Sequence, residues 1–303
     1  QQAPLSTPPD RLYISNSPES VSQPQVLCVA RLEPGSNSRL LYHHRSISSK
    51  ALYFEMSLEN PGSEPVSVFL KSRAAGPSEH EAFAGHVAAS AALADSFQQR
   101  GAFITIPAGG AVSFSRIKTT KGLTSSAVAE VAVLSGGPLY WLTSALESAP
   151  VPSWQPRASK PLATLERWKL TPSYPALLET NFEADLSGKW LFVPIGGANV
   201  KGSDDSTLLM GDYGVLHRIQ ITLANSLPNA TEVEVMHYAG AGYCTATYSL
   251  QGVFAELPGC QGSTQTPVAR FTMPANSSRQ FTIYTMPESG SHYPATLILR
   301  KAQ

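Results

Sequence analysis

The residues best suited to metal chemistry are the seven histidines, and their spacing does not match a metal site. His43 and His44 are neighbours, so in a strand their side chains would point to opposite faces and could not easily share one ion. His80 and His86 would lie about 120° apart around a helix. A zinc-protease motif needs a second histidine four residues after the first, and Ala84 stands at that position. We therefore predict no metal site.

The sequence also lacks the common motifs for nucleophilic catalysis and for phosphate binding. No Gly-x-Ser-x-Gly elbow is present, and Gly196 and Gly197 are not followed by Gly-Lys-Ser/Thr. Asp204 and Asp205 could contribute to a calcium loop, but the alternating ligands of a dedicated site are missing, which favours a solvated turn. We predict no catalytic residue and no bound cofactor. A hydrolase is kept as the third hypothesis, and it would need an interdomain cleft where histidines and carboxylates converge.

The three cysteines raise the question of a disulfide. Cys244 and Cys260 flank one loop that contains proline and glycine, so a disulfide between them is predicted for an oxidising compartment. The alternative is that all three are unrelated buried thiols. Cys28 lies in an apolar run over 26–30 and is interpreted as a small core residue.

Aromatic side chains could form a surface on which sugar rings stack. The candidates for glycan-binding or interface aromatics are Tyr140, Trp141, Trp154 and Trp168. For Trp141 and Trp190 we favour the other interpretation, in which they are core or interface residues of their strands. A polysaccharide-binding module is therefore the second hypothesis for function.

Strands are the elements that would position these residues. Over 51–72 the apolar residues recur at every second position on both sides of a turn signal at 60–65, which predicts a β-hairpin with a longer loop. The only strong helix is predicted at about 78–100, where Ser78 and Glu81 fit a capping box. Further strands are predicted over 25–32, 39–44, 102–106, 111–117, 127–134 and 139–143.

The second half of the chain repeats the first. Asn60 corresponds to Asn225 at an offset of 165 residues, and Phe114 corresponds to Phe281 at an offset of 167. Blocks that keep their order at a nearly constant offset indicate an internal duplication. The predicted fold class is therefore all-β, with two tandem immunoglobulin-like β-sandwich domains and one helix inserted in the first.

The chain is predicted to divide into four parts. Residues 1–25 are rich in Pro, Ser and Gln and are expected to form an extended N-terminal arm that lies across a domain or a neighbouring subunit. The first sandwich covers 26–146, a proline-rich connector covers 147–175, and the second sandwich covers 176–303. Within the connector, only 162–170 could form a short helix.

Composition and charge exclude several classes of function. Lys and Arg total 22, as do Asp and Glu, so a nucleic-acid partner, which needs a basic face, is not expected. No run of about 18 apolar residues is present, so no membrane span is predicted. Charged residues make up only 15% of the chain, and weak mutual repulsion suits close packing beside other copies.

Export is predicted from the start of the chain and from a resemblance. The chain begins with Gln1, as a mature protein does after a signal peptide is removed. Several segments, taken in order, resemble a family of exported cyanobacterial proteins of unknown function, and the resemblance covers most of the chain. It implies an exported β protein, extracellular, at the cell surface or periplasmic, and it assigns no catalytic residue. The segments are 14–19, 43–44, 58–68, 161–168 and 211–214.

The first hypothesis for function is a non-catalytic structural or assembly protein of the cell surface, such as a self-associating subunit of a filament or layer. The expected partners are copies of the chain or other cell-envelope proteins, with polysaccharide as the alternative. Association would bury surface between copies, and the arm 1–25 would add a strand to an open sheet edge of a neighbour.

Overall fold

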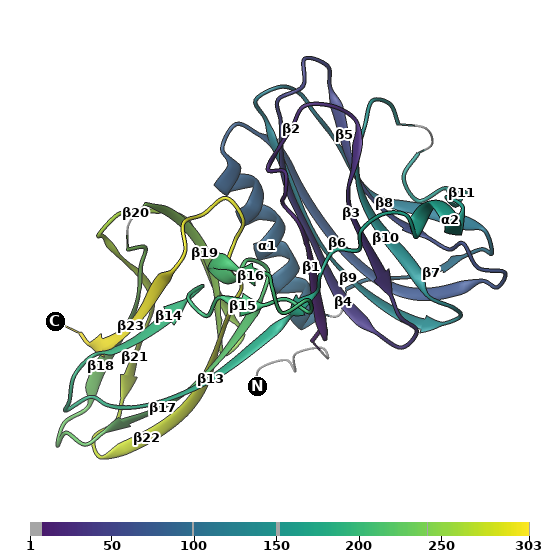
Figure 1. Ribbon diagram of the computed structural model, residues 1–303. Coiled ribbons are helices and arrows are strands. Elements are labelled where there is room, and N and C mark those ends of the chain that lie inside the picture. The colour runs from purple at the N-terminus through teal and green to yellow at the C-terminus, as the bar shows by residue number, and fades with distance from the viewer. Residues whose placement is uncertain (1–7, 99, 150–151, 241, 303) are drawn as a thin grey trace.

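Two β-sandwiches, joined along one side by a long helix, make up the computed structural model (Figure 1). It describes residues 8–98, 100–149, 152–240 and 242–302. The chain is mostly β with several sheets, so the prediction of a β-sandwich protein with one principal helix is confirmed at this level. No helix in the described ranges has the length and apolar character that crossing a membrane requires.

The first sandwich packs sheet A against sheet B. Sheet A consists of β1 (Arg11–Ser15), β2 (Ser20–Val21), β4 (Asn37–Ser46), β6 (Val66–Ser78), β7 (Ala102–Ile106), β9 (Thr124–Ser135) and β12 (Tyr174–Pro175). Its order is β12-β1-β4-β9-β6-β7, with β2 beside β4. Sheet B, in the order β11-β8-β5-β10-β3, consists of β3 (Gln25–Leu32), β5 (Leu52–Glu59), β8 (Gly110–Thr119), β10 (Leu139–Leu146) and β11 (Pro156–Ala158).

The second sandwich packs sheet C against sheet D. Sheet C, in the order β13-β17-β22-β19-β20, consists of β13 (Leu177–Asp185), β17 (Leu216–Asn225), β19 (Tyr243–Leu250), β20 (Val253–Gln261) and β22 (Ser277–Thr285). Sheet D, in the order β14-β23-β18-β21, consists of β14 (Leu191–Ile195), β18 (Thr231–Tyr238), β21 (Gln265–Met273) and β23 (Ala295–Lys301). Between β14 and β17 lie β15 (Val200–Lys201), β16 (Leu208–Leu209) and the 3-10 helix η1 (Met210–Asp212).

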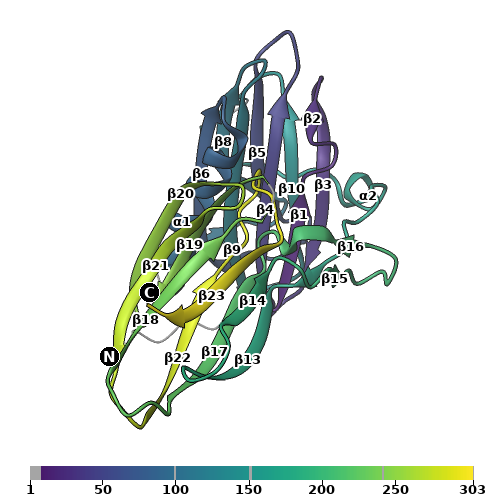
Figure 2. The same ribbon diagram turned by 90° about the vertical axis from the view of Figure 1, so that its left-hand side faces the viewer.

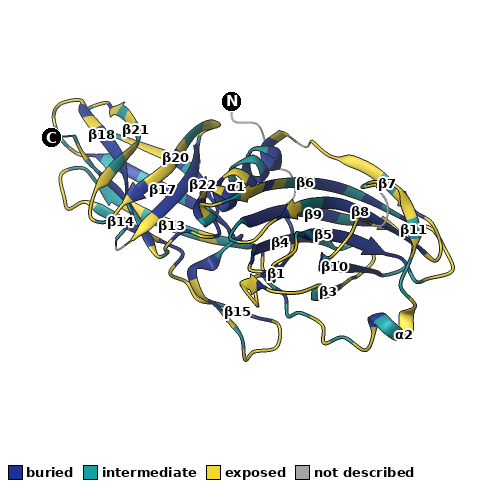
Figure 3. Ribbon diagram, turned by 90° about the horizontal axis from the view of Figure 1, so that it is seen from above, coloured by how far each residue is buried: buried dark blue, intermediate teal, exposed yellow. Residues whose placement is uncertain are grey.

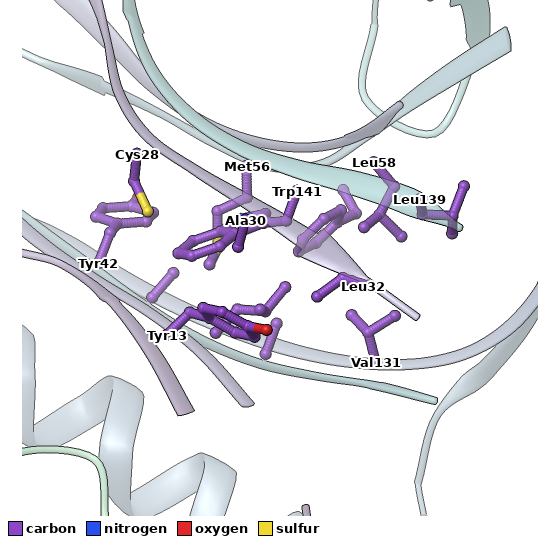
Figure 4. Packing of buried hydrophobic residues seen from close by; sticks show 14 of the residues in the cluster. Tyr13, Cys28, Ala30, Leu32, Tyr42, Met56, Leu58, Val131, Leu139 and Trp141 are labelled. Carbon is purple, nitrogen blue, oxygen red and sulfur yellow. The ribbon is translucent and has the colours of Figure 1, made fainter. Parts of the chain in front are cut away.

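The alternating apolar residues of β5 fill the core of the first sandwich. Phe54, Met56 and Leu58 are all buried, because every second side chain of a strand points to the same face. Trp141 of β10 is fully buried and its ring lies 6.5 Å from that of Tyr13 in the facing sheet (Figure 4). Burying each such side chain contributes about 1.5–3 kcal/mol, so this cluster is the main apolar core of the first sandwich.

The stretch 51–72 is not the predicted hairpin. β5 belongs to sheet B and β6 to sheet A, so the turn at 60–65 crosses from one sheet to the other. The prediction was wrong about the pairing because inward-facing residues alternate in the same way whether the next strand joins the same sheet or the facing one.

Asn60 ties this crossing to a second one. Its side-chain amide donates hydrogen bonds to the carbonyl oxygens of Glu64 (2.8 Å), Ile106 (3.2 Å) and Pro107 (3.0 Å). The last two residues lie where the chain crosses from β7 in sheet A to β8 in sheet B. One buried amide therefore fixes both crossings at this end of the sandwich.

Asn225 repeats the arrangement in the second sandwich. Its amide donates to the carbonyl oxygens of Asn229 (3.1 Å), Met273 (3.2 Å) and Pro274 (2.8 Å). The strand order β14-β23-β18-β21 also matches the order β4-β9-β6-β7 of the first sandwich. The two sandwiches differ in the segment that follows β6 or β18, which is a helix in the first and β19 with β20 in the second.

The helix is α1 (Glu81–Gln98), inside the predicted range of about 78–100. The predicted capping box does not form, because the Ser78 hydroxyl accepts a hydrogen bond from the N–H of His80, before the helix begins. α1 contacts β6 and β9 on one side and β19 and β20 on the other (Figure 2). Its many alanines suit this place, since small side chains let two sandwiches approach one helix.

The predicted N-terminal arm contributes β1 and β2 to sheet A. β1 runs parallel to β4 and Leu12 within it is fully buried, so this part of 1–25 lies along its own domain, which is one of the two places expected for the arm. The sequence does not predict this strand, because its apolar run, 12–14, is short. Residues 1–7 lie outside the described residues. The connector 147–175 holds β11, β12 and the short helix α2 (Leu162–Leu165), with 150–151 outside the described part.

Candidate functional site between the sandwiches

Two apolar clusters fill the seam, which is the contact of sheet A and α1 with the second sandwich. One cluster combines Leu41 of β4, Ala88 of α1 and Met286, which follows β22. In the other, Phe97 of α1 packs edge-on against Tyr284 of β22 with ring centroids 5.1 Å apart. Burial of apolar area contributes about 25 cal/mol per Å², so the seam holds the two sandwiches together as one body.

A buried arginine crosses the seam. Arg39 of β4 pairs with Glu130 of β9 at 2.8 Å and donates through Nη1 to the carbonyl oxygens of Ala176 (3.0 Å) and Gly214 (2.8 Å). Burial alone would raise the pKa of Glu130, but the charges of Arg39 and Lys71 outweigh burial and lower it. The guanidinium therefore stays balanced by a carboxylate while it binds the backbone of the second sandwich.

A second polar contact joins α1 to the loop 286–294. His86 Nδ1 lies 2.8 Å from the Glu288 carboxylate, whose other oxygen accepts a hydrogen bond from the Thr247 hydroxyl at 2.8 Å. Glu288 is fully buried. Burial opposes a charge on His86, but the hydrogen bond and charge of Glu288, with the charge of Glu256, raise the pKa of His86 overall. The pair is favoured as an ion pair between helix and loop.

Two glycines let this loop touch the helix. A Cβ on Gly85 would lie 1.7 Å from the carbonyl oxygen of Ser289, a distance that no side chain could occupy. Gly290 has a φ of +80°, and a Cβ there would lie 2.7 Å from the backbone N of Ala82. The loop backbone therefore packs directly on the first turns of α1.

A polar hollow of about 300 Å³ lies beside this contact. Segments far apart in the sequence meet there, because the seam brings the outer face of sheet A against the loop after β22. The lining consists of Asn16 and Glu19 between β1 and β2, His43 of β4, Glu81 of α1, Tyr213 after η1, and 289–292.

His43 is the unusual member of this lining. Its side chain is only 5% exposed, yet within the described part of the chain neither ring nitrogen has a hydrogen-bond partner. Burial lowers its pKa to about 4, so at neutral pH the ring is uncharged and offers one donor and one acceptor. Leaving such a group buried and unpaired costs about 1–3 kcal/mol.

His44 is satisfied, in contrast, on the opposite face of β4. Its Nε2 lies 2.8 Å from the Ser15 hydroxyl, and its Nδ1 lies 2.9 Å from the carbonyl oxygen of Pro18. The ring stacks in the sandwich core, 5.6 Å from the ring of Phe54. The two neighbouring histidines thus face opposite ways, as predicted, and only His43 lines the hollow.

The rest of the lining offers hydrogen-bonding groups. The Glu81 carboxylate of the lining pairs with Arg45, outside it, at 3.4 Å, and the Tyr213 hydroxyl donates to the carbonyl oxygen of Ser291 at 2.8 Å. Over the described ranges, no three His, Cys, Asp or Glu side chains gather closely enough to hold a metal ion. The arrangement suits recognition of a ligand through hydrogen bonds.

The predicted disulfide between Cys244 and Cys260 is absent, which corrects that prediction. The two residues are direct partners across β19 and β20, but both are free, buried thiols. The Cys244 thiol instead donates to the carbonyl oxygen of Thr245 at 3.3 Å, and burial raises its pKa to about 12. Cys28 is also buried and free, as its apolar surroundings predicted.

The predicted glycan or interface aromatics do not lie together. Trp141 is inside the first core, and Tyr140, its neighbour on the other face of β10, is covered by Leu165 of α2. Trp168 packs against that same cover, and only Trp154 is substantially exposed, at 49%. These four aromatic residues therefore form no common platform, because β10 turns two of them to opposite faces.

The sequence does not mark the residues that build the seam. Arg39 stands within a predicted strand, His86 stands within the predicted helix without the spacing of a metal ligand, and Glu288 belongs to no motif. A usable signal was the charge of Arg39 at the start of an apolar strand, since a charge there needs a buried partner. Nothing local indicates that the partner lies in the other sandwich.

No protein-family model and no curated protein matches the chain. Among solved structures it is similar to a turret protein of Sulfolobus turreted icosahedral virus, with 10% identity, 93% of this chain and 100% of that chain covered, and a TM-score of 0.20. It is also similar to the protein YhaK from Escherichia coli, with 11% identity, 94% and 89% covered, and a TM-score of 0.20. At such scores neither likeness carries an argument about fold or function.

Proposed function

We propose that this protein is a non-catalytic structural or assembly subunit of the cell surface that associates with copies of itself through a sheet edge. Its body would be two immunoglobulin-like sandwiches derived from one by internal duplication. The matching strand orders and the corresponding bonds of Asn60 and Asn225 support the duplication. The packed seam supports a rigid subunit, and the motif resemblance supports export.

The observation that carries the proposal is the edge strand β7. It ends sheet A, so one side of its backbone has no strand partner within the described chain. Its sequence, Ala-Phe-Ile-Thr-Ile, holds neither the charge nor the proline that usually protects such an edge. Phe103 is 79% exposed, and its ring lies 5.0 Å from that of Phe69. An unprotected aromatic edge of this kind favours strand pairing between molecules.

A second exposed edge lies in the other sandwich. β14 ends sheet D, Phe192 within it is 55% exposed, and the ring of Trp190 lies 6.2 Å away. β7 and β14 lie toward opposite ends of the molecule (Figure 3). Contact between two different edges would repeat head to tail and build a filament, whereas contact of β7 with itself would close a dimer.

The hollow at the seam supports binding over catalysis. A catalytic histidine is usually held by a third group and bonded to the group that it activates. His43 has neither partner in the described chain, and its lowered pKa, about 4, makes it a weak base at neutral pH.

The proposal is tested by light scattering after size-exclusion chromatography over a series of protein concentrations. We expect the wild type to form oligomers that grow with concentration, because dispersed monomers leave β7 open. Phe103→Lys should shift association to concentrations at least about tenfold higher, since a lysine blocks an edge. Val253→Lys, a matched change at another exposed edge residue (72% exposed on β20), should behave as the wild type. A wild type that stays monomeric, or two variants with equal effects, contradicts the proposal.

A further inference from the structure

We propose that the second sandwich binds a free carboxylic acid with a single apolar chain, in a pocket between the edges of its two sheets. β20 ends sheet C and β21 ends sheet D, and these two edge strands lie side by side (Figure 2). The pocket that they border has a volume of about 290 Å³. The inference does not rest on self-association, which concerns the edges β7 and β14.

The walls of the pocket are apolar side chains from both sheets. Leu250 and Phe281 come from sheet C, and Val268 and Phe271 come from sheet D. Phe281 belongs to the core of the second sandwich, while the other three pack against that core and are only partly buried. The apolar interior of this sandwich is therefore open to a ligand at this side, and walls that are mostly apolar and aromatic are typical of small-molecule sites.

Arg279 of β22 occupies an inward-facing position beside this pocket. It pairs in register with Leu223 of β17, and its guanidinium lies 5.5 Å from the ring centroid of Phe271 in the facing sheet. In the first sandwich, Val112 pairs with Leu58 in the same way, and both are core residues. An exposed arginine therefore stands in the second sandwich where the first has a buried valine.

The guanidinium of Arg279 is available to an anion. It donates to the side-chain oxygen of Gln251 at 2.6 Å, which uses one of its five N–H groups, and it has no carboxylate partner within the described chain. Arg270, the other arginine of the lining, already pairs with Glu234. The described residues of the lining include no Asp or Glu, so nothing there repels a negative charge.

A carboxylate is the head group that fits this arginine. A guanidinium can bind both oxygens of a carboxylate through two parallel N–H groups. The single charge of a carboxylate also matches the single available arginine, whereas a phosphate monoester carries about −1.5 to −2.

The volume of the pocket sets the size of the apolar chain. At about 30 Å³ for each water-sized group, the volume of about 290 Å³ holds about ten such groups, which corresponds to one chain of about ten carbon atoms. Each methylene group that leaves water raises affinity about fourfold, so affinity should rise with chain length until the pocket is full.

The test is isothermal titration calorimetry of the full chain with hexanoate, octanoate, decanoate and dodecanoate, each below the concentration at which it forms micelles. Decan-1-ol and decyl phosphate carry the chain of decanoate with a neutral and a more highly charged head. We expect affinity to rise about fourfold per methylene group up to decanoate and to level off at dodecanoate. Decanoate should bind at least about tenfold more tightly than decan-1-ol, because only the acid pairs with Arg279.

Two variants locate the head and the chain of the ligand. Arg279→Gln changes an exposed side chain, so it should fold as the wild type does, lose at least about tenfold in affinity for decanoate and bind decan-1-ol unchanged. Arg11→Gln, the same change at an exposed arginine of the first sandwich, is the control and should bind decanoate as the wild type does. Ala255→Phe enlarges a side chain of the lining and should shift the preference from decanoate to shorter acids.

The inference is overturned if no acid of the series binds, or if decan-1-ol or decyl phosphate binds as tightly as decanoate. It is also overturned if Arg279→Gln keeps the wild-type affinity for decanoate, or if folded Ala255→Phe keeps the wild-type preference for chain length.

Discussion

Asn60 and Asn225 each hold two crossings between facing sheets with one buried side-chain amide. Replacing either asparagine with alanine leaves buried carbonyl groups without donors. We expect Asn60→Ala and Asn225→Ala each to lower the free energy of unfolding by about 1–3 kcal/mol, measured by urea denaturation. Asn229→Ala removes only an exposed side chain and should change it little. A neutral result for both buried positions would contradict the role given to the amides.

Acid should destabilise the fold through its buried neutral histidines. Burial lowers the pKa of His43, His44 and His237 to about 4, from an ordinary value of about 6.5. Between these two pH values the histidines are protonated in the unfolded chain but stay neutral in the folded chain. The free energy of unfolding therefore falls as pH falls through that window. Each histidine accounts for up to about 3 kcal/mol.

His86 has the opposite effect on the pH dependence of stability, since its pKa is raised in the folded chain. Its contribution to stability is present below its unfolded pKa and is lost as pH rises through its folded pKa. Urea denaturation at pH 7 and pH 4.5 measures the net effect, which we expect to be a clear loss of stability in acid. His43→Phe should reduce the proton uptake on unfolding in this window by about one. Equal stability at both pH values would show that the histidines are not buried and neutral.

Single residues were predicted well where a strand alone sets the outcome. The opposite directions of His43 and His44, and the burial of Cys28 and Trp141, follow from alternation and apolar neighbours. The missing hydrogen-bond partners of His43 could not be predicted, because they depend on which distant segments border the ring.

At the scale of elements, the contact between α1 and the loop 286–294 depends on Gly85. In an open helix, Gly→Ala adds about 1 kcal/mol of stability. Here a Cβ would meet the carbonyl oxygen of Ser289, so we expect Gly85→Ala to destabilise by about 1–3 kcal/mol instead. Ser90→Ala, on a less buried part of the same helix, is the control and should be neutral or slightly stabilising. Thermal unfolding followed by circular dichroism decides the sign.

Element bounds were predictable, while their pairing was not. β3 and β7 occupy the predicted ranges 25–32 and 102–106, because apolar alternation and turn residues mark where strands begin and end. The same alternation does not identify the partner strand, so the sequence predicts a hairpin where the chain crosses to the facing sheet after β5. The short apolar run of β1 likewise does not identify its parallel partner β4.

At the scale of the whole molecule, the seam should make the two sandwiches unfold together. Trp141 lies in the core of the first sandwich, and Trp190 lies against Phe192 and Arg300 of the second. In the wild type we expect calorimetry and tryptophan fluorescence to give one coincident transition. Glu288→Leu removes the carboxylate that holds His86 and Thr247 and should separate the transitions or lower the first one. Two transitions in the wild type would mean that the seam couples the sandwiches weakly.

The mostly β layout of the chain could be predicted from alternating apolar residues, whereas the seam and its hollow could not. The hollow joins Asn16 to His292, and no local pattern reports a contact over that separation. Low charge led us to expect association between copies, and for this association we propose the β7 edge, since β1 is paired within its own sheet.

Electron microscopy of the native material, prepared without dissociation, tests the proposed self-association most directly. The account predicts regular filaments or layers in which neighbouring subunits meet at the β7 edge, and their loss when Phe103→Lys replaces the wild type. Separate single subunits in the native material, with no order between them, would contradict it.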